Sequence, residues 1–222
     1  MKGVFFDIGS TLVTGPDISP SKAIAKILNI DANLVKDIIM VTDLTSSSDL
    51  VKALANIVKV EELTVHTDKI VHLWDTQESA AKEITGAAET VKSLKKMGLL
   101  IGLISDIWSP YYKSFKRACP DIAAIADSAA LSFKDGVRKP NPVLFEKALA
   151  SLNLTPDAAV MVGDSYVSDI EPAMMLGMRT VWCLFRPDSE LSSIVRVFNG
   201  ELKKPDYVIG TISQLLTLDL WS

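Results

Sequence analysis

Short apolar runs alternate with amphipathic stretches along much of the chain, and this alternation predicts strands and helices in turn. The predicted strands are apolar throughout, as is typical of parallel strands that helices cover on both faces. They span residues 4–6, 99–104, 125–131, 158–162, 180–184 and 207–209. The predicted helices between and after them span residues 87–97, 110–118, 142–152, 169–176 and 213–218. The pattern therefore predicts an α/β fold, a doubly wound parallel sheet with a Rossmann-like core.

Residues 14–85 show helical periodicity and no recognisable strand. The helices predicted in this segment span residues 21–28, 32–40, 49–58 and 67–84. The segment contains seven lysines, no arginine and eleven acidic residues, so it carries the whole formal net charge of −4. We therefore expect an α/β core formed by residues 1–13 and 86–222, interrupted by an all-helical domain formed by residues 14–85.

The composition excludes several classes of protein. With 23 lysines and arginines against 27 acidic residues in 222, the chain lacks the basic excess of a nucleic-acid binder. Cys119 and Cys183 form neither a metal-ligand spacing nor a disulfide framework, which fits a reducing cytoplasm. Asp7 interrupts the apolar start too early for a secretory signal, and no apolar run approaches the roughly 18 residues of a membrane span. We expect a cytoplasmic monomer or homodimer without a membrane partner.

Polar residues that could carry chemistry follow several of the predicted strands, at the edge where open parallel sheets bind ligands. Asp7 ends the first strand, and an aspartate there can act as a covalent nucleophile or only cap a turn. Ser105 ends the next strand, where its hydroxyl can hydrogen-bond a phosphoryl oxygen or cap a helix. Lys139 precedes a helix that starts with proline, and its ammonium can bind a phosphoryl group or remain solvated.

The most specific pattern is Gly163-Asp164 followed by Asp169, two carboxylates five residues apart across a strand-to-helix turn. Such a pair can hold Mg²⁺, which typically takes one or two carboxylates together with water and phosphate oxygens. Asp169 on its own could equally cap the following helix. The spacing therefore predicts a metal site at the same edge of the sheet.

The order of these features, from Asp7 to Ser105, Lys139 and the aspartate pair, resembles the four motifs of the haloacid dehalogenase superfamily of hydrolases. The similarity covers residues 1–13 and 86 to about 218. It implies the phosphatase-like branch, in which a helical cap follows the first motif, so that residues 14–85 would be the cap.

The resemblance also implies roles for single residues. Asp7 would be the nucleophile, and Ser105 and Lys139 would hold the transferring phosphoryl group. Asp164 and Asp169 would complete a Mg²⁺ site with Asp7 and with the backbone carbonyl of Gly9. Two further substrate contacts are expected directly after Ser105, at Asp106 and Trp108.

Gly9 departs from the family pattern, because phosphatases of this family usually carry there the aspartate that protonates the leaving group. A positioned general acid contributes roughly 10² to 10⁴ in rate, so its loss should affect alkyl phosphates most. We therefore expect a Mg²⁺-dependent hydrolase of a small phosphorylated metabolite that favours good leaving groups.

Three alternatives accompany this expectation. The protein could be a phosphonate-cleaving hydrolase that uses a cap lysine, with Lys22, Lys26, Lys36 and Lys52 as candidates. It could instead be a phosphate-binding or regulatory module with weakened catalysis. Dehalogenation is disfavoured for two reasons. Dehalogenases of the family need an arginine in the cap, and residues 14–85 contain none. They also work without metal, whereas this chain keeps the aspartate pair of a metal site.

Overall fold

The computed structural model describes residues 1–15 and 19–221, and within them all strands join one parallel sheet. The sheet consists of β1 (Gly3–Phe6), β2 (Leu100–Ser105), β3 (Ser128–Leu131), β4 (Ala159–Gly163), β5 (Arg179–Cys183) and β6 (Tyr207–Ile209). Its order is β3-β2-β1-β4-β5-β6, so the direction of winding reverses between β1 and β4. Ligands of such sheets bind outside the carboxyl ends of the strands at this reversal.

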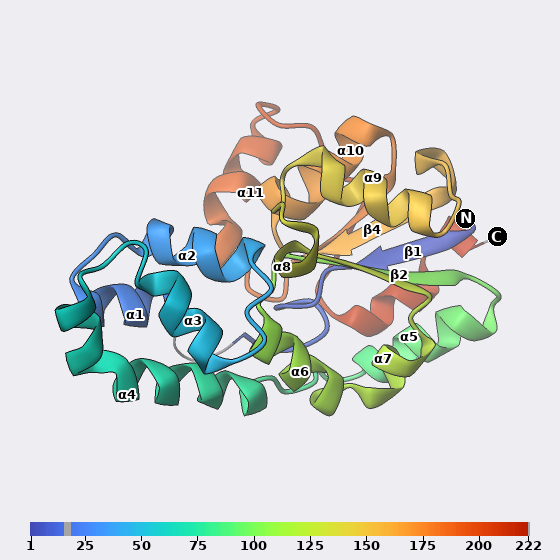
Figure 1. The fold of residues 1–222 in the computed structure, drawn as a ribbon. Helices are drawn as coiled ribbons and strands as arrows, with labels where there is room; N and C mark the ends of the chain where they lie inside the picture. The colour runs from blue at the N-terminus through green and yellow to red at the C-terminus, as the bar shows by residue number, and fades with distance from the viewer. Residues whose placement is uncertain (16–18, 222) are drawn as a thin grey trace.

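Helices cover both faces of the sheet, with α9 and α10 on one side and α5 and α7 on the other (Figure 1). Helix α5 (Ala87–Lys96) precedes β2. The α-helices that follow β2 are α6 (Ser109–Ala118), α7 (Pro120–Ile125), α8 (Ser132–Asp135), α9 (Pro142–Ser151), α10 (Glu171–Leu176) and α11 (Leu191–Phe198). The predicted doubly wound core is confirmed.

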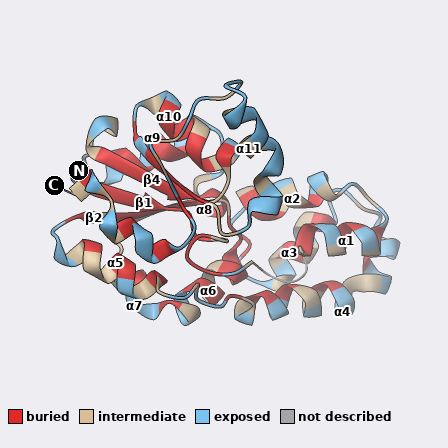
Figure 2. Cartoon of the chain, turned by 180° about the vertical axis from the view of Figure 1, so that it is seen from behind, coloured by how far each residue is buried: buried red, intermediate tan, exposed pale blue. Residues whose placement is uncertain are grey.

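Successive residues of β1 show why the strands are apolar throughout. Val4 and Phe6 join the core cluster that contains Leu94 of α5, whereas Phe5 joins the cluster that contains Phe145 of α9. Because side chains alternate between the faces of a strand, both faces of β1 need apolar residues. The central strands β1 and β4 are accordingly buried, while the outer faces of the helices are exposed (Figure 2).

The first four α-helices that the structure describes after β1 lie to one side of the sheet and form the inserted helical segment (Figure 1). They are α1 (Pro20–Leu28), α2 (Ala32–Val41), α3 (Ser47–Leu54) and α4 (Val60–Thr76). The two chain crossings that lead into and out of this segment are hydrogen-bonded, from Thr14 N to Lys82 O (2.8 Å) and from Ile84 N to Leu12 O (2.9 Å). The segment also contacts the core where α2 packs against α8 and residues 77–79 pack against α6.

Several predicted elements differ from the structure. The helix predicted at 67–84 spans Val60–Thr76, because residues 77–81 dock onto α6, where Ser114 Oγ accepts a hydrogen bond from Ala81 N (2.8 Å). The helix predicted at 49–58 is α3, and a 3₁₀ helix (Ile212–Thr217) takes the place of the helix predicted at 213–218. The sequence pattern did not predict α7, α8 or α11, which are six, four and eight residues long.

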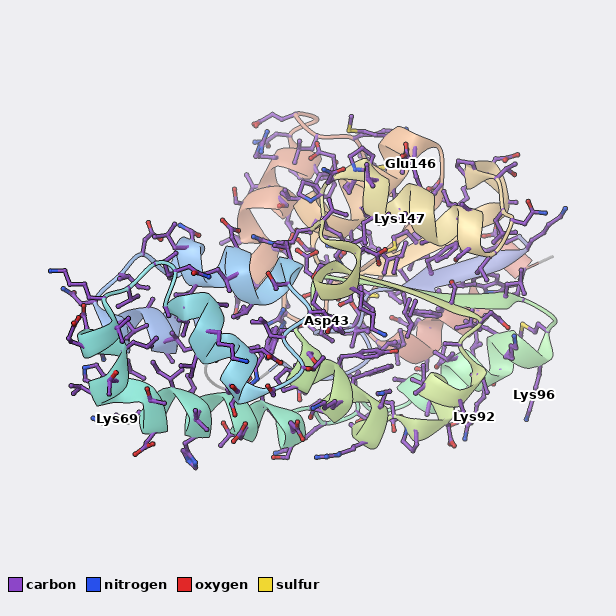
Figure 3. All side chains as sticks on the ribbon, viewed as in Figure 1. Asp43, Lys69, Lys92, Lys96, Glu146 and Lys147 are labelled. Carbon is purple, nitrogen blue, oxygen red and sulfur yellow. The ribbon has the colours of Figure 1, made fainter. Side chains whose placement is uncertain are left out.

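Charged side chains of the outer helix faces point away from the molecule, as Lys69 on α4 and Lys96 on α5 do in Figure 3. Both residues are exposed. In the part of the chain that the structure describes, no helix is long and apolar enough to cross a membrane.

Candidate active site

Three side chains from separate segments meet at the carboxyl ends of β1 and β2. The backbone N–H of Asp7 donates to Val162 O (2.9 Å), which extends the pairing of β1 with β4 as far as Asp7. Asp7 Oδ1 accepts hydrogen bonds from Ser105 Oγ (3.0 Å) and from Lys139 Nζ (2.7 Å). Asp7 is buried at 6% exposure, so its carboxylate is held in one orientation by a hydroxyl and a cation.

Lys139 reaches this point from the loop before α9 and is buried with its charge. Its Nζ also donates to Asp169 Oδ1 (2.5 Å) and to the carbonyl oxygen of Ile104 (3.3 Å). Burial lowers the pKa of Lys139, but the charges of Asp169, Asp7 and Asp106 outweigh it and hold that pKa above its usual range. The side chain therefore remains an ammonium ion that faces two carboxylates.

Asp164 and Asp169 are brought together by one π-helical turn that follows β4 and spans Tyr166–Ile170. Within it, Ile170 N donates to Ser165 O (3.3 Å), and Ser165 N donates to Asp169 Oδ2 (3.0 Å). A Cβ at Gly163 would lie 2.4–2.5 Å from atoms of the Asp169 side chain, so only glycine leaves room for this arrangement. Such turns often occur at functional sites.

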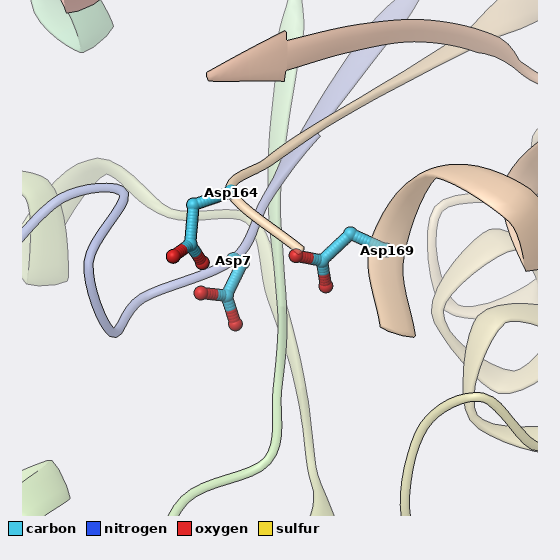
Figure 4. A group of neighbouring side chains, drawn as sticks. All are labelled: Asp7, Asp164 and Asp169. Carbon is cyan, nitrogen blue, oxygen red and sulfur yellow. The ribbon is translucent and has the colours of Figure 1, made fainter. Parts of the chain in front are cut away.

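The carboxylates of Asp7, Asp164 and Asp169 converge on one point (Figure 4). Each offers an oxygen that lies within 4.8 Å of the other two. Burial, with the nearby charge of Asp7, raises the pKa of Asp164 to about 6, against the lowering effect of Arg186. Burial likewise raises the pKa of Asp169, although Lys139 opposes it. Three crowded carboxylates beside one ammonium ion retain excess negative charge, and this all-oxygen donor set fits Mg²⁺.

Two cavities open around these carboxylates and share Gly9, Asp106, Asp164 and Ser165 in their walls. The first, the nucleophile cavity, measures about 260 Å³ and is also lined by Asp7, Lys139 and Asp169. The second, the aromatic cavity, measures about 360 Å³ and is also lined by Ser105, Trp108 and Tyr111. The eight residues that the sequence singled out for phosphoryl transfer, substrate contact and metal binding each line at least one of the two cavities. Of the four candidate cap lysines, Lys36 alone lines either of them.

Asp106 and Trp108 have structural roles as well as places in the cavity walls. Asp106 Oδ1 accepts a hydrogen bond from the backbone N–H of Lys139 (2.8 Å), so it fixes the loop that carries this lysine. The ring of Trp108 stacks on Tyr111 with 4.8 Å between centroids. The indole N–H of Trp108 is buried and has no hydrogen-bond partner among the described residues. Their contacts with substrate stay predictions.

Three residues at the site were missed by reasoning from the sequence: Thr11, Arg138 and Arg186. Thr11 Oγ1 lies 3.5 Å from Asp7 Oδ2. Arg138 links Asp106 (3.4 Å) to Asp37 of α2 (2.7 Å) and so joins the core to the helical segment. The third, Arg186, lines the aromatic cavity. Lys36, one of the four cap lysines considered from the sequence, lines the nucleophile cavity. Only Thr11 and Arg138 gave a local signal, because each stands beside a motif residue.

Comparison with known proteins decides the family. A family model described as a haloacid dehalogenase-like hydrolase matches residues 1–177. The chain belongs to this family. The 2-haloacid dehalogenase of Pseudomonas syringae pv. Tomato superposes with a TM-score of 0.66 at 22% identity, covering 98% of this chain and 97% of that one. At that identity the likeness shows the fold.

Relatives of this haloacid dehalogenase-like hydrolase bear phosphatase names. A glyceraldehyde 3-phosphate phosphatase of Pyrococcus furiosus is 33% identical over 66% of this chain and 58% of its own length. One of Methanocaldococcus jannaschii is 26% identical over 98% of this chain and 96% of its own length. The chain thus spans about half the length of the two Pyrococcus relatives (58% and 47%) and nearly the whole length of the Methanocaldococcus one.

Proposed function

We propose that this protein is a Mg²⁺-dependent phosphohydrolase in which Asp7 attacks phosphorus. The observation that supports this most is the geometry of Asp7, whose carboxylate is held by Ser105 (3.0 Å) and Lys139 (2.7 Å) at the carboxyl edge of the sheet. Asp164 and Asp169 stand beside it with oxygens within 4.8 Å. A nucleophile, a cation and a metal-type donor set together suit phosphoryl transfer, which depends mainly on positioning and on charge stabilisation.

Each residue of the site has a separate part in this reaction. Asp7 forms a bond to phosphorus as the bond to the leaving oxygen breaks, which gives a phosphoaspartate that water then hydrolyses. Lys139 offsets the charge of the phosphoryl oxygens, and the hydroxyl of Ser105 donates a hydrogen bond to one of them. Mg²⁺ held by Asp7, Asp164, Asp169 and the Gly9 carbonyl would add further charge stabilisation.

Gly9 sets the preference among substrates. No side chain at this position can protonate the leaving oxygen, so groups that depart readily as anions are favoured. The substrate is a small phosphorylated metabolite, because the two cavities measure only about 260 and 360 Å³. The phosphatase names of the relatives support this class of substrate.

The test compares an acyl, an aryl and an alkyl phosphate with Mg²⁺ and with EDTA, using wild-type protein and Asp7→Asn. We expect hydrolysis in the order acyl, aryl, alkyl, loss of activity in EDTA, and loss in Asp7→Asn. Hydrolysis that survives Asp7→Asn would remove Asp7 from the mechanism. No turnover of any phosphate, with Mg²⁺ and phosphate still bound, would favour the regulatory module.

Phosphonate cleavage is the second candidate, and one observation favours it. Of the four cap lysines considered from the sequence, Lys36 lines the nucleophile cavity together with Asp7 and Lys139. An amine there could form a Schiff base with a carbonyl-bearing phosphonate. Borohydride should then trap the protein with an aldehyde phosphonate, and Lys36→Arg should abolish trapping. Absence of trapping would exclude this function.

The division into core and cap is proposed with the same boundaries, residues 14–85 forming the cap. Movement of the cap would admit substrate and release product, with hinges near Thr14-Gly15-Pro16 and Thr85-Gly86, of which Pro16 lies outside the described residues. A cleavable cross-link between cysteines replacing Asp37 and Arg138, which face each other across the two parts (2.7 Å), tests this. Turnover should stop on cross-linking and return on cleavage; unchanged turnover would contradict it.

A further inference from the structure

One cation in the cavity walls has no part in the proposed chemistry. Arg186 follows β5, and one terminal nitrogen of its guanidinium lies 2.7 Å from Asp164 Oδ2. Its side chain is nevertheless 58% exposed, and its other nitrogens have no partner among the described residues. A guanidinium has five N–H donors, so most of its hydrogen-bonding capacity faces open space.

That space is where the leaving group of a substrate would lie. Arg186 lines the aromatic cavity with Gly9 and Ser105, and Ser105 contacts the proposed nucleophile. A Cβ at Gly9 would meet nothing within 4 Å, so this part of the cavity is open. Arg186 also lines a neighbouring cavity of about 440 Å³, the linker cavity, whose wall includes Ile84, Phe185 and Ile212. Arg186 therefore stands where the two cavities meet, on the side of the site where the leaving group would lie.

The walls around Arg186 suit a flat apolar group that carries a negative charge. Trp108 and Tyr111 present a stacked pair of rings, and the linker cavity adds Phe185. Arginine binds planar carboxylates through two parallel hydrogen bonds, which lysine cannot do. The carboxylates of Asp106 and Glu190 also line this cavity and would repel a substrate carboxylate that is not paired with Arg186.

We propose that Arg186 determines specificity by binding a carboxylate on the leaving group of an aryl or similarly flat apolar phosphate. This rests on the proposed function, since it assigns the leaving-group side of the same site. The carboxylate would come from the substrate itself, and the cap contributes no arginine to bind it.

A matched pair of substrates tests the proposal: 4-carboxyphenyl phosphate and 4-carbamoylphenyl phosphate. The two have the same shape and leave as phenols of similar acidity, but only the first carries the extra anion. We expect wild-type protein to prefer the carboxylate by about tenfold or more in kcat/KM, as for a charge-assisted hydrogen bond. Arg186→Gln should bring the ratio to about one, and Arg186→Lys should retain part of it.

The control variant is Arg179→Gln. Arg179 lies at the other end of β5, is 56% exposed, and pairs with Asp206 (2.6 Å) much as Arg186 pairs with Asp164. Its loss should leave the ratio unchanged. Arg186→Gln also removes the partner of Asp164. A general disturbance of Asp164 would slow both substrates equally, so it would leave the ratio of their kcat/KM values unchanged.

Binding to Asp7→Asn, measured by calorimetry with the same two phosphates, separates this proposal from the proposed function. Preferred binding of the carboxylate without any turnover in the wild type would support the role of Arg186 and refute the hydrolase. Turnover of both substrates at equal kcat/KM, or a preference that survives Arg186→Gln, would overturn the role of Arg186 and leave the hydrolase intact.

Discussion

Gly9 stands two residues after the proposed nucleophile, where phosphatases of this family usually carry an acid, and the structure has room for one. A Cβ at this position would meet no atom within 4 Å, and the backbone of Gly9 is outside the left-handed region. Gly9→Asp should therefore fold without strain. Because Gly9 lines both the nucleophile and the aromatic cavities, the new carboxyl group would lie where the two adjoin.

The magnitude follows from what the new carboxyl group can do. Asp7 and Asp164 lie nearby, and like charges disfavour the ionised form of a third carboxyl, so the protonated form needed for an acid is favoured. General acids contribute roughly 10² to 10⁴ in rate. We expect the low end, about 10²-fold in kcat/KM for an alkyl phosphate, or about 2.7 kcal/mol of transition-state stabilisation. An aryl phosphate should gain less, and an acyl phosphate, whose leaving group needs no proton, should not gain.

The assay measures kcat/KM for the three phosphates at saturating Mg²⁺. Gly15→Asp is the matched control, because Gly15 also lines the aromatic cavity and a Cβ there would lie 4.0 Å from its nearest neighbour, Ser10 Oγ. It adds the same charge to the same cavity at a different point. The reasoning fails if Gly9→Asp changes all three substrates by one common factor, or if Gly15→Asp reproduces the gain on the alkyl phosphate.

Three further outcomes depend on the buried charges of the site. Lys139→Ala leaves Asp7 and Asp169 without their cation, so the free energy of unfolding in EDTA should fall by about 3–5 kcal/mol in urea titrations; an unchanged midpoint would contradict this. Gly163→Ala should displace the Asp169 side chain and weaken Mg²⁺ binding at least about tenfold by calorimetry, whereas an unchanged Kd would show that the π-helical turn tolerates a Cβ. The raised pKa values of Asp164 and Asp169 mean that protons compete with Mg²⁺ as pH falls, so the rise in Tm caused by Mg²⁺ should be larger at about pH 8 than at about pH 5.5; a rise independent of pH would refute this.

The strand ends were predictable because they depend on local sequence. Asp7 follows an apolar run that predicts a buried strand, and Ser105 follows another. In a parallel sheet the carboxyl ends of the strands share one edge, so strand prediction alone places such residues near one another. The structure brings Asp7, Ser105 and Lys139 within hydrogen-bond distance, although their roles stay predictions.

The helix boundaries were less predictable where packing overrides local preference. Residues 77–84 continue a helical pattern, yet the α-helix ends at Thr76, because the following residues are held by α6. Glu78 there pairs with Lys113 (2.8 Å) and Arg117 (3.3 Å), neither of which is near it in the sequence. Contacts of this kind depend on how α4 and α6 approach each other, and periodicity does not report that.

The electrostatic field at the site was the feature least accessible from sequence. The segment 14–85 carries the whole formal net negative charge, and by itself such a charge repels anionic substrates. Yet the neighbours Lys36 and Asp37 on α2 separate in space, since Lys36 lines the nucleophile cavity while Asp37 pairs with Arg138. A helix turns by about 100° per residue, so adjacent charges face different surroundings. The charge that a substrate meets depends on which face of α2 turns to the core. The net charge of segment 14–85 therefore understates how well the nucleophile cavity, which Lys36 lines, can accept an anion.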